Sequence, residues 1–294
     1  MNHILQDLGY TEFFEKYRLE NSPGDFETGR VVAEHKQRYR VRTAKGEFEA
    51  EVTGNLRYSA QSREDFPAVG DWVSLINYDD HHALIQVVFP RLSLISRTAV
   101  GKKGEKQVIA ANIDVAFLVQ AVDRDFNLNR LERYLAISCQ SGITPAIVLT
   151  KTDLTDSEQL QEIVASIRKR IPDIPLFPVS NQTLQGYEAL QDFLESGKTY
   201  CLLGSSGVGK STLTNRLTGL ESMKTSTISQ STGKGRHVTS HRELTLLPGG
   251  GILIDNPGMR EIGIADAGEG LESAFDRIME ISENCKYKDC KHIS

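Results

Sequence analysis

Five short runs of β-branched and aromatic residues occupy the first third of the chain, and polar or glycine-containing turns separate them. Runs of this length and spacing predict the strands of a small β-barrel. A five-stranded OB barrel and an SH3-like barrel both satisfy the pattern. We expect Trp72 to lie in the barrel core rather than to stack on a nucleic-acid base. The expected strands cover residues 29–34, 39–43, 47–52, 71–76 and 83–88.

The hydrophobic pattern changes after residue 109, where apolar runs become nearly continuous. Such runs predict strands of a parallel sheet buried on both faces. A helix is expected over 125–134, capped by Asp125 or Asn127, and another over 211–217. The region therefore predicts an α/β domain that follows the barrel. Its expected strands cover residues 115–121, 145–149, 176–179, 200–203 and 251–254.

A glycine-rich loop between the run at 200–203 and the helix at 211–217 fits G-x-x-x-x-G-K-[ST]. Its glycines let backbone N–H groups turn toward a phosphate, Lys210 supplies a positive charge, and the Ser211 hydroxyl can bind Mg²⁺. The alternative is a glycine turn with a surface lysine. The expected nucleotide contacts are Gly204, Ser205, Ser206, Gly207, Val208, Gly209, Lys210, Ser211 and Thr212.

The motif Thr150-Lys151-Thr152-Asp153 stands at the end of the run at 145–149. A carboxylate at Asp153 can accept hydrogen bonds from guanine N1–H and its 2-amino group, which adenine does not offer. Ser180 and Asn181, after the next run, form a candidate second base contact. Thr150 stands where many GTPases have Asn, so we expect weaker affinity without altered specificity. The alternative interpretation of the Lys151-Thr152-Asp153 pattern is a solvated turn.

The segment Asp255-Asn-Pro-Gly258 follows the last apolar run, so Asp255 can hold the Mg²⁺ shell and the Gly258 N–H can reach a γ-phosphate. Met259 follows Gly258, and a thioether cannot orient water. His237 is our candidate for positioning the attacking water, and Thr239 is expected to close over Mg²⁺ and the γ-phosphate. The alternative for His237 is a surface histidine that contacts RNA. We interpret the polar segment 221–240 as a switch that bound γ-phosphate and Mg²⁺ order through Thr239, and a plain linker is the alternative.

The base-reading motif precedes the phosphate loop, whereas ordinary GTPases have the reverse order, so the chain is interpreted as a circular permutation. This order resembles the ribosome small subunit-dependent GTPase A family (RsgA, also called YjeQ). The resemblance also rests on GKGRHVTS at 233–240, DNPG at 255–258, and the GRVV and PAVGDWV segments near the N-terminus. It implies an OB barrel, a permuted Ras-like GTPase domain, and a late assembly factor that binds the 30S subunit and its 16S rRNA. It also implies GTP hydrolysis to GDP in the presence of that subunit. The resemblance likewise points to His237 as the residue that positions the attacking water.

Near the end of the chain, Cys285, Cys290 and His292 have the spacing of zinc ligands. The resembled family continues as C-x₄-C-x-H-x₅-C, which places a fourth ligand beyond Ser294. We therefore expect an incomplete Zn²⁺ site. Cys139 and Cys201 lie on expected core elements and are interpreted as packing residues. The expected domains are 1–109 (barrel), 110–268 (GTPase) and 269–294 (the start of a zinc-binding extension).

Composition limits the function classes that remain. The formal net charge is −5 and no apolar run is long enough to span a membrane, so we expect a cytoplasmic monomer without a membrane partner. Because the net charge is negative, any RNA contact would have to be made by local basic patches. Two such patches are expected: Arg38, Arg40 and Arg42 share one face of an expected strand, and residues 91–106 form a second basic stretch. A solvated strand face is the simpler interpretation. Two competing functions are a GTP switch for a protein or membrane partner and an RNA-binding module with a degenerate GTP site.

Overall fold

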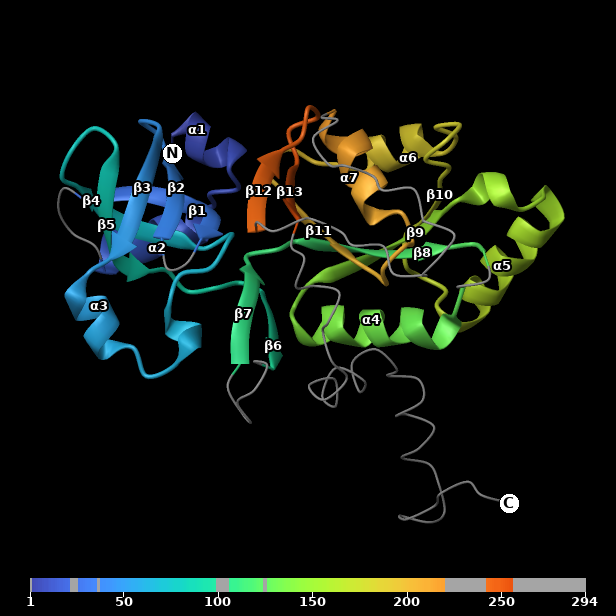
Figure 1. Cartoon of the computed structure of the whole chain (residues 1–294), viewed down its shortest axis with the longest axis horizontal. Coiled ribbons are helices and arrows are strands. Elements are labelled where there is room, and N and C mark those ends of the chain that lie inside the picture. The colour runs from blue at the N-terminus through green and yellow to red at the C-terminus, as the bar shows by residue number, and fades with distance from the viewer. Residues whose placement is uncertain are drawn as a thin grey trace, which may run out of the picture.

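The computed structural model describes residues 2–21, 26–35, 38–98, 106–123, 126–219 and 242–255. The described strands form an eleven-stranded sheet and a separate hairpin of β6 (Leu94–Thr98) and β7 (Lys106–Ala111). Figure 1 shows the sheet as a barrel on the left that continues into a helix-covered open sheet on the right. No helix in the described part of the chain is both long and apolar enough to cross a lipid bilayer.

The barrel has five strands in the pairing order β1-β2-β3-β5-β4, and β4 returns to pair with β1. All neighbours are antiparallel except β3 and β5, which run parallel. Every strand lies within two residues of its predicted position, and the topology is that of an OB-like barrel. The strands are β1 (Glu27–His35), β2 (Arg38–Thr43), β3 (Glu47–Val52), β4 (Trp72–Asn77) and β5 (His82–Val88), with α3 (Gly54–Ser59) and η1 (Arg63–Asp65) between β3 and β4.

Trp72 is fully buried, but the prediction that it lies in the barrel core is wrong in detail. Its neighbours Val73 and Leu75 belong to the cluster inside the barrel, whereas Trp72 packs with the N-terminal helices α1 (His3–Asp7) and α2 (Glu12–Asn21). The Tyr10 ring meets the indole edge to face, with centroids 4.8 Å apart. The indole thus holds these helices on the outside of the barrel, where no base can reach it.

The open part of the sheet has the order β10-β9-β8-β11-β13-β12, in which β12 alone is antiparallel to its neighbour. Helices α4 and α5 pack on one face, and α6 and α7 pack on the other. This double cover explains the continuous apolar runs. The elements are β8 (Val115–Ala121), α4 (Leu128–Gln140), β9 (Thr144–Thr150), η2 (Thr152–Leu154), α5 (Ser157–Arg170), β10 (Leu176–Pro178), α6 (Tyr187–Asp192), β11 (Thr199–Leu203), α7 (Lys210–Thr218), β12 (Arg242–Leu246) and β13 (Ile252–Asp255).

The two parts are joined by strand pairing and by one buried arginine. Strand β1 pairs antiparallel with β12, with Ala33 opposite Glu243. Arg30 is 1% exposed and donates to the backbone carbonyls of Leu8, Gly70 and Asn112 at 2.6, 3.1 and 3.0 Å. Burial lowers the pKa of its guanidinium to about 10, so it remains charged at neutral pH.

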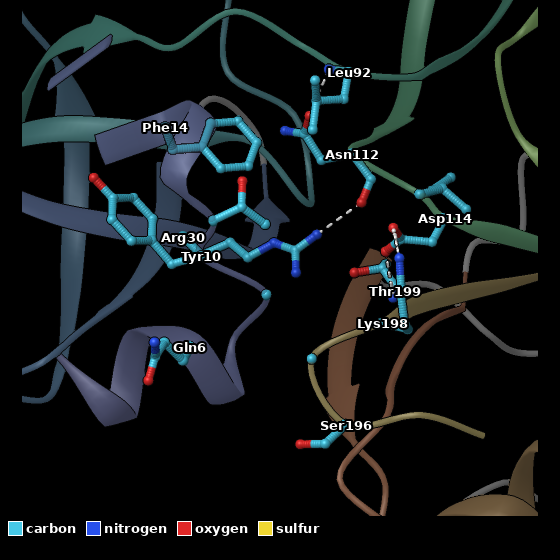
Figure 2. A pocket seen from close by; sticks show the side chains of 14 residues that line it. Gln6, Tyr10, Phe14, Arg30, Leu92, Asn112, Asp114, Ser196, Lys198 and Thr199 are labelled. Carbon is cyan, nitrogen blue, oxygen red and sulfur yellow. Dashed lines mark hydrogen bonds and ion pairs between the residues drawn. The ribbon is translucent and has the colours of Figure 1, made fainter. Parts of the chain in front are cut away.

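A cavity of about 310 Å³ lies beside this arginine. Figure 2 shows Arg30 directed toward Asn112, with Lys198 and Asp114 on the wall that belongs to the open sheet. The Lys198 ammonium lies 3.2 Å from the Asp114 carboxylate. These residues stand at the start of β8 and β11, so the cavity is at the opposite edge of the sheet from the loop that follows β11.

Candidate nucleotide site

The phosphate loop connects the carboxyl end of β11 to the first turn of α7, as predicted. A Cβ atom at Gly204 would lie 2.4 Å from the carbonyl oxygen of Val119, so only glycine fits there. Gly209 caps α7 with a φ of 95°, a left-handed conformation that favours glycine. The Lys210 Nζ donates to the carbonyl oxygens of Gly204 and Ser205, at 2.6 and 2.5 Å. A glycine-rich loop, a helix N-terminus and an ammonium group placed together in this way can bind an anion.

The base-reading segment is bonded directly to this loop through Thr150. Thr150 is fully buried at the end of β9, and its hydroxyl donates to the Val208 carbonyl at 2.5 Å and to the Gln120 carbonyl at 3.3 Å. The Asn181 side-chain amide reaches the Gly209 carbonyl at 3.3 Å, and its oxygen accepts from Tyr187 at 2.6 Å. Asn181 therefore braces the phosphate loop, in addition to the base contact predicted for it. The two motifs are therefore in direct contact although they are distant in the sequence.

Asp153 lies on η2, directly after this segment of β9, and its carboxylate is oriented by Ser180. The Ser180 hydroxyl donates to Asp153 Oδ1 at 2.5 Å. The same hydroxyl accepts from the backbone N–H groups of Gln182 and Thr183, which fix its direction. Asp153 is exposed whereas Ser180 is buried, so the carboxylate is held by a buried hydroxyl and remains accessible to a ligand. An exposed carboxylate can accept hydrogen bonds from two N–H donors of a ligand.

Lys151 adopts a left-handed backbone conformation, with a φ of 61°. Such a conformation is uncommon in a residue other than glycine, and it persists where surrounding contacts impose it. The Lys151 Nζ lies 2.7 Å from Asp123, which follows β8. The pair holds the loops after β8 and β9 together at the carboxyl edge of the sheet, where open α/β sheets bind ligands.

Two of the predicted Mg²⁺ ligands lie in the described part of the chain. Ser211 is the second residue of α7, and Asp255 is the last residue of β13. Strands β11 and β13 are parallel neighbours, with Cys201 opposite Ile254, so Asp255 lies next to the strand that leads into the phosphate loop. A hydroxyl and a carboxylate are oxygen donors of the kind Mg²⁺ prefers, so the donor set fits the ion.

Several predicted site residues fall outside the described residues. They are His237, Thr239 and Gly258 of the expected switch segments and Cys285, Cys290 and His292 of the expected zinc site. Within the described ranges, no three His, Cys, Asp or Glu side chains are grouped closely enough to hold a metal. Cys201 belongs to the buried hydrophobic core, and Cys139 of α4 packs against that core, as expected for packing residues. Burial raises the pKa of the Cys201 thiol, which makes it a poor nucleophile.

The expected basic patches are partly neutralised. Arg38, Arg40 and Arg42 do share one face of β2, but they lie near the carboxylates of Glu51, Glu47 and Glu243. In the second stretch, Arg91 is structural: it forms a bidentate pair with the buried Asp71 at 2.8 and 2.7 Å. It also donates to two backbone carbonyls of the β3–β4 connection. Arg91 is therefore removed from the RNA-contact candidates, and the other basic side chains of that stretch lie outside the described ones.

Motif reasoning missed two residues at the site, Gln120 and Arg130. Gln120 is the only polar residue in the apolar strand β8, is 1% exposed, and forms two hydrogen bonds with the backbone of Asn127. A glutamine within an otherwise apolar run was the available signal, because a buried amide requires partners. Arg130, on α4, donates to the Ser205 hydroxyl at 2.8 Å. No motif includes that arginine, so the sequence offered no sign of its contact.

A model of the RsgA GTPase family matches residues 88–265. The chain is 42% identical over 291 residues to "Small ribosomal subunit biogenesis GTPase RsgA 1" of Listeria innocua, covering 99% of this chain and 81% of that protein. It is 43% identical to the RsgA protein of Methanosarcina acetivorans, covering 92% and 72% of the two chains.

Two solved structures share the fold at 22% identity and a TM-score of 0.66. They are YjeQ from Thermotoga maritima, covering 92% of this chain and 87% of that one, and YloQ, titled a circularly permuted GTPase, covering 93% and 86%. The chain therefore belongs to the RsgA GTPase family and is a GTP hydrolase with a circularly permuted motif order.

Proposed function

We propose that this protein binds the small (30S) ribosomal subunit and hydrolyses GTP to GDP and phosphate during late maturation of that subunit. The proposal draws its partner from the relatives, which are named small ribosomal subunit biogenesis GTPases. One observation carries the chemistry: the Thr150 hydroxyl of the base-reading segment is bonded to Val208 of the phosphate loop. A single nucleotide can therefore span Asp153 and Lys210.

We assign the roles at this site as follows. Asp153, oriented by Ser180, reads guanine, and Lys210 with the loop N–H groups holds the β- and γ-phosphates. Ser211, Asp255 and Thr239 hold Mg²⁺, which when bound neutralises charge that develops on the phosphate oxygens. These residues bind and orient the nucleotide, but none of them is assigned to position the attacking water.

His237 is the residue that we assign to this water. Met259 occupies the position where Ras-like enzymes carry glutamine, and it cannot orient a water molecule. We infer that the free protein hydrolyses GTP slowly, on the order of 10⁻⁴ per second, as GTPases do when the catalytic group is not in place. The subunit accelerates hydrolysis by arranging residues 221–240 around His237.

The remaining assignments concern the rest of the chain. We propose that 1–109 forms the RNA-contacting part, 110–268 the GTPase domain, and 269–294 the start of a zinc-binding extension that uses Cys285, Cys290 and His292. We propose that the barrel contacts 16S rRNA, since OB barrels commonly bind oligonucleotides. Phosphates would have to displace the glutamates that now pair with Arg38, Arg40 and Arg42. We propose a monomer as the acting form.

Co-sedimentation with purified 30S subunits tests the function directly. The wild-type chain is expected to pellet with the subunits under a non-hydrolysable GTP analogue and to remain in the supernatant under GDP. Lys210→Ala, which loses the nucleotide, should remove this difference. Binding that ignores the nucleotide would favour an RNA-binding module with a degenerate GTP site, and absence of binding would favour a GTP switch for another partner.

A further inference from the structure

Two cations converge on Ser205, the second residue of the phosphate loop. The Lys210 ammonium contacts its backbone carbonyl at 2.5 Å, and the Arg130 guanidinium donates to its side-chain hydroxyl at 2.8 Å. In phosphate loops the lysine reaches the β- and γ-phosphates. Because Arg130 contacts the same residue as this lysine, its charge lies on the β,γ side of the loop.

The fold fixes the position of Arg130 through the start of α4. Buried Gln120 donates to the Asn127 carbonyl at 2.8 Å and accepts from the Asn127 N–H at 2.9 Å. Asn127 in turn caps α4, where its side chain accepts from the Arg130 N–H at 3.1 Å. The helix end is therefore clamped to β8, and β8 is bonded to Thr150 through the Gln120 carbonyl. Arg130 projects from a fixed position rather than from a free loop.

We propose that Arg130 is a positioning residue of the GTP site, which acts through Ser205 to hold the phosphate loop in the shape that accepts a γ-phosphate. This inference rests on the nucleotide site proposed above. A guanidinium stays charged at all physiological pH values and presents a planar fork of donors, so it can orient a hydroxyl and add positive potential together. A triphosphate carries more charge at this end than a diphosphate. Arg130 therefore raises the preference for GTP over GDP.

The test compares the nucleotide affinities of this chain, residues 1–294. Fluorescent GDP and a fluorescent non-hydrolysable GTP analogue, each with Mg²⁺, are titrated into wild type, R130Q, S205A and the double variant. R130Q should weaken the GTP analogue about tenfold and GDP less than about threefold, the size expected for loss of one charge-assisted contact. The double variant should be no weaker than R130Q, because both changes remove one interaction.

Two further variants separate this role from a general loss of structure. R130K keeps the charge but not the fork, and it should recover part of the preference for the GTP analogue. R133Q changes an exposed arginine of the same helix, and it should bind both nucleotides as wild type does.

Three results would overturn the role of Arg130 and leave the proposed nucleotide site intact. They are an equal loss of affinity for both nucleotides in R130Q, wild-type affinities in R130Q, and additive losses in the double variant. Failure of the wild type to bind either nucleotide would instead overturn the nucleotide site, and the inference with it.

Discussion

The hydroxyl of Thr150 is the most direct link between the two halves of the site, and Thr150→Val removes it while keeping a β-branched side chain of similar shape. The hydroxyl is fully buried and donates to the Val208 carbonyl at 2.5 Å. Without it, that buried carbonyl loses its partner, which costs about 1–3 kcal/mol. If this cost falls on the loop conformation that binds phosphate, GDP affinity falls between about fivefold and about a hundredfold.

Titration of fluorescent GDP, alongside thermal unfolding, measures this effect. Selectivity for guanine over adenine should persist, because Lys151 and Asp153 remain. Thr155→Val is the matched control: its hydroxyl bonds to Gln159 at 2.8 Å in an exposed position, so affinity and stability should change by less than about 0.5 kcal/mol. Wild-type GDP affinity and an unchanged unfolding temperature in Thr150→Val would refute the idea that this hydroxyl braces the phosphate loop.

Two more predictions address the junction and the chemistry. Arg30→Met removes the buried donor of the Leu8 and Asn112 carbonyls and one of the two side-chain donors of the Gly70 carbonyl, so the free energy of unfolding should fall by about 3 kcal/mol. Arg38→Met, whose side chain is 72% exposed, should change it by less than about 0.5 kcal/mol. Equal stability of the two variants in denaturant unfolding would contradict this role for Arg30. His237→Ala should abolish subunit-stimulated phosphate release while GTP affinity stays near wild type, and retained stimulation would assign the water to another residue.

The strand positions could be predicted because each depends on a local pattern. Strand β8 is predicted at its observed bounds, since its side chains alternate between two buried faces and every one of them except Gln120 is apolar. Asn127 was one of two predicted caps for α4, and the structure selects it. The pairing of β1 with β12 could not be predicted, because hydrophobic alternation does not specify which distant strand becomes the neighbour. The direction of the Trp72 side chain could not be predicted either. Both faces of β4 are covered at this position, so the expected burial of Trp72 does not tell whether it points into the barrel or toward the N-terminal helices.

At the site, motif spacing located the phosphate loop and the base-reading segment, and the structure brings them together. Spacing could not reveal contacts made by residues outside the motifs. Arg130 reaches Ser205 only because a glutamine in one strand clamps the start of the next helix. Likewise, the charge pattern suggested Arg91 as an RNA contact, whereas its guanidinium neutralises the buried Asp71. Burial raises the pKa of that carboxyl, and the paired arginine opposes the shift.

The base preference of Asp153→Asn tests the central claim, that one site reads guanine through Asp153 and holds the phosphates through the phosphate loop. Affinities of wild type and variant for GDP and for xanthosine diphosphate are measured by titration at fixed Mg²⁺. An amide cannot accept the two guanine donors, so GDP affinity should fall by on the order of a hundredfold or more, and xanthosine diphosphate should become the tighter ligand. A variant that still prefers GDP as strongly as wild type would show that Asp153 does not read the base, and the assignment of this nucleotide site would fail.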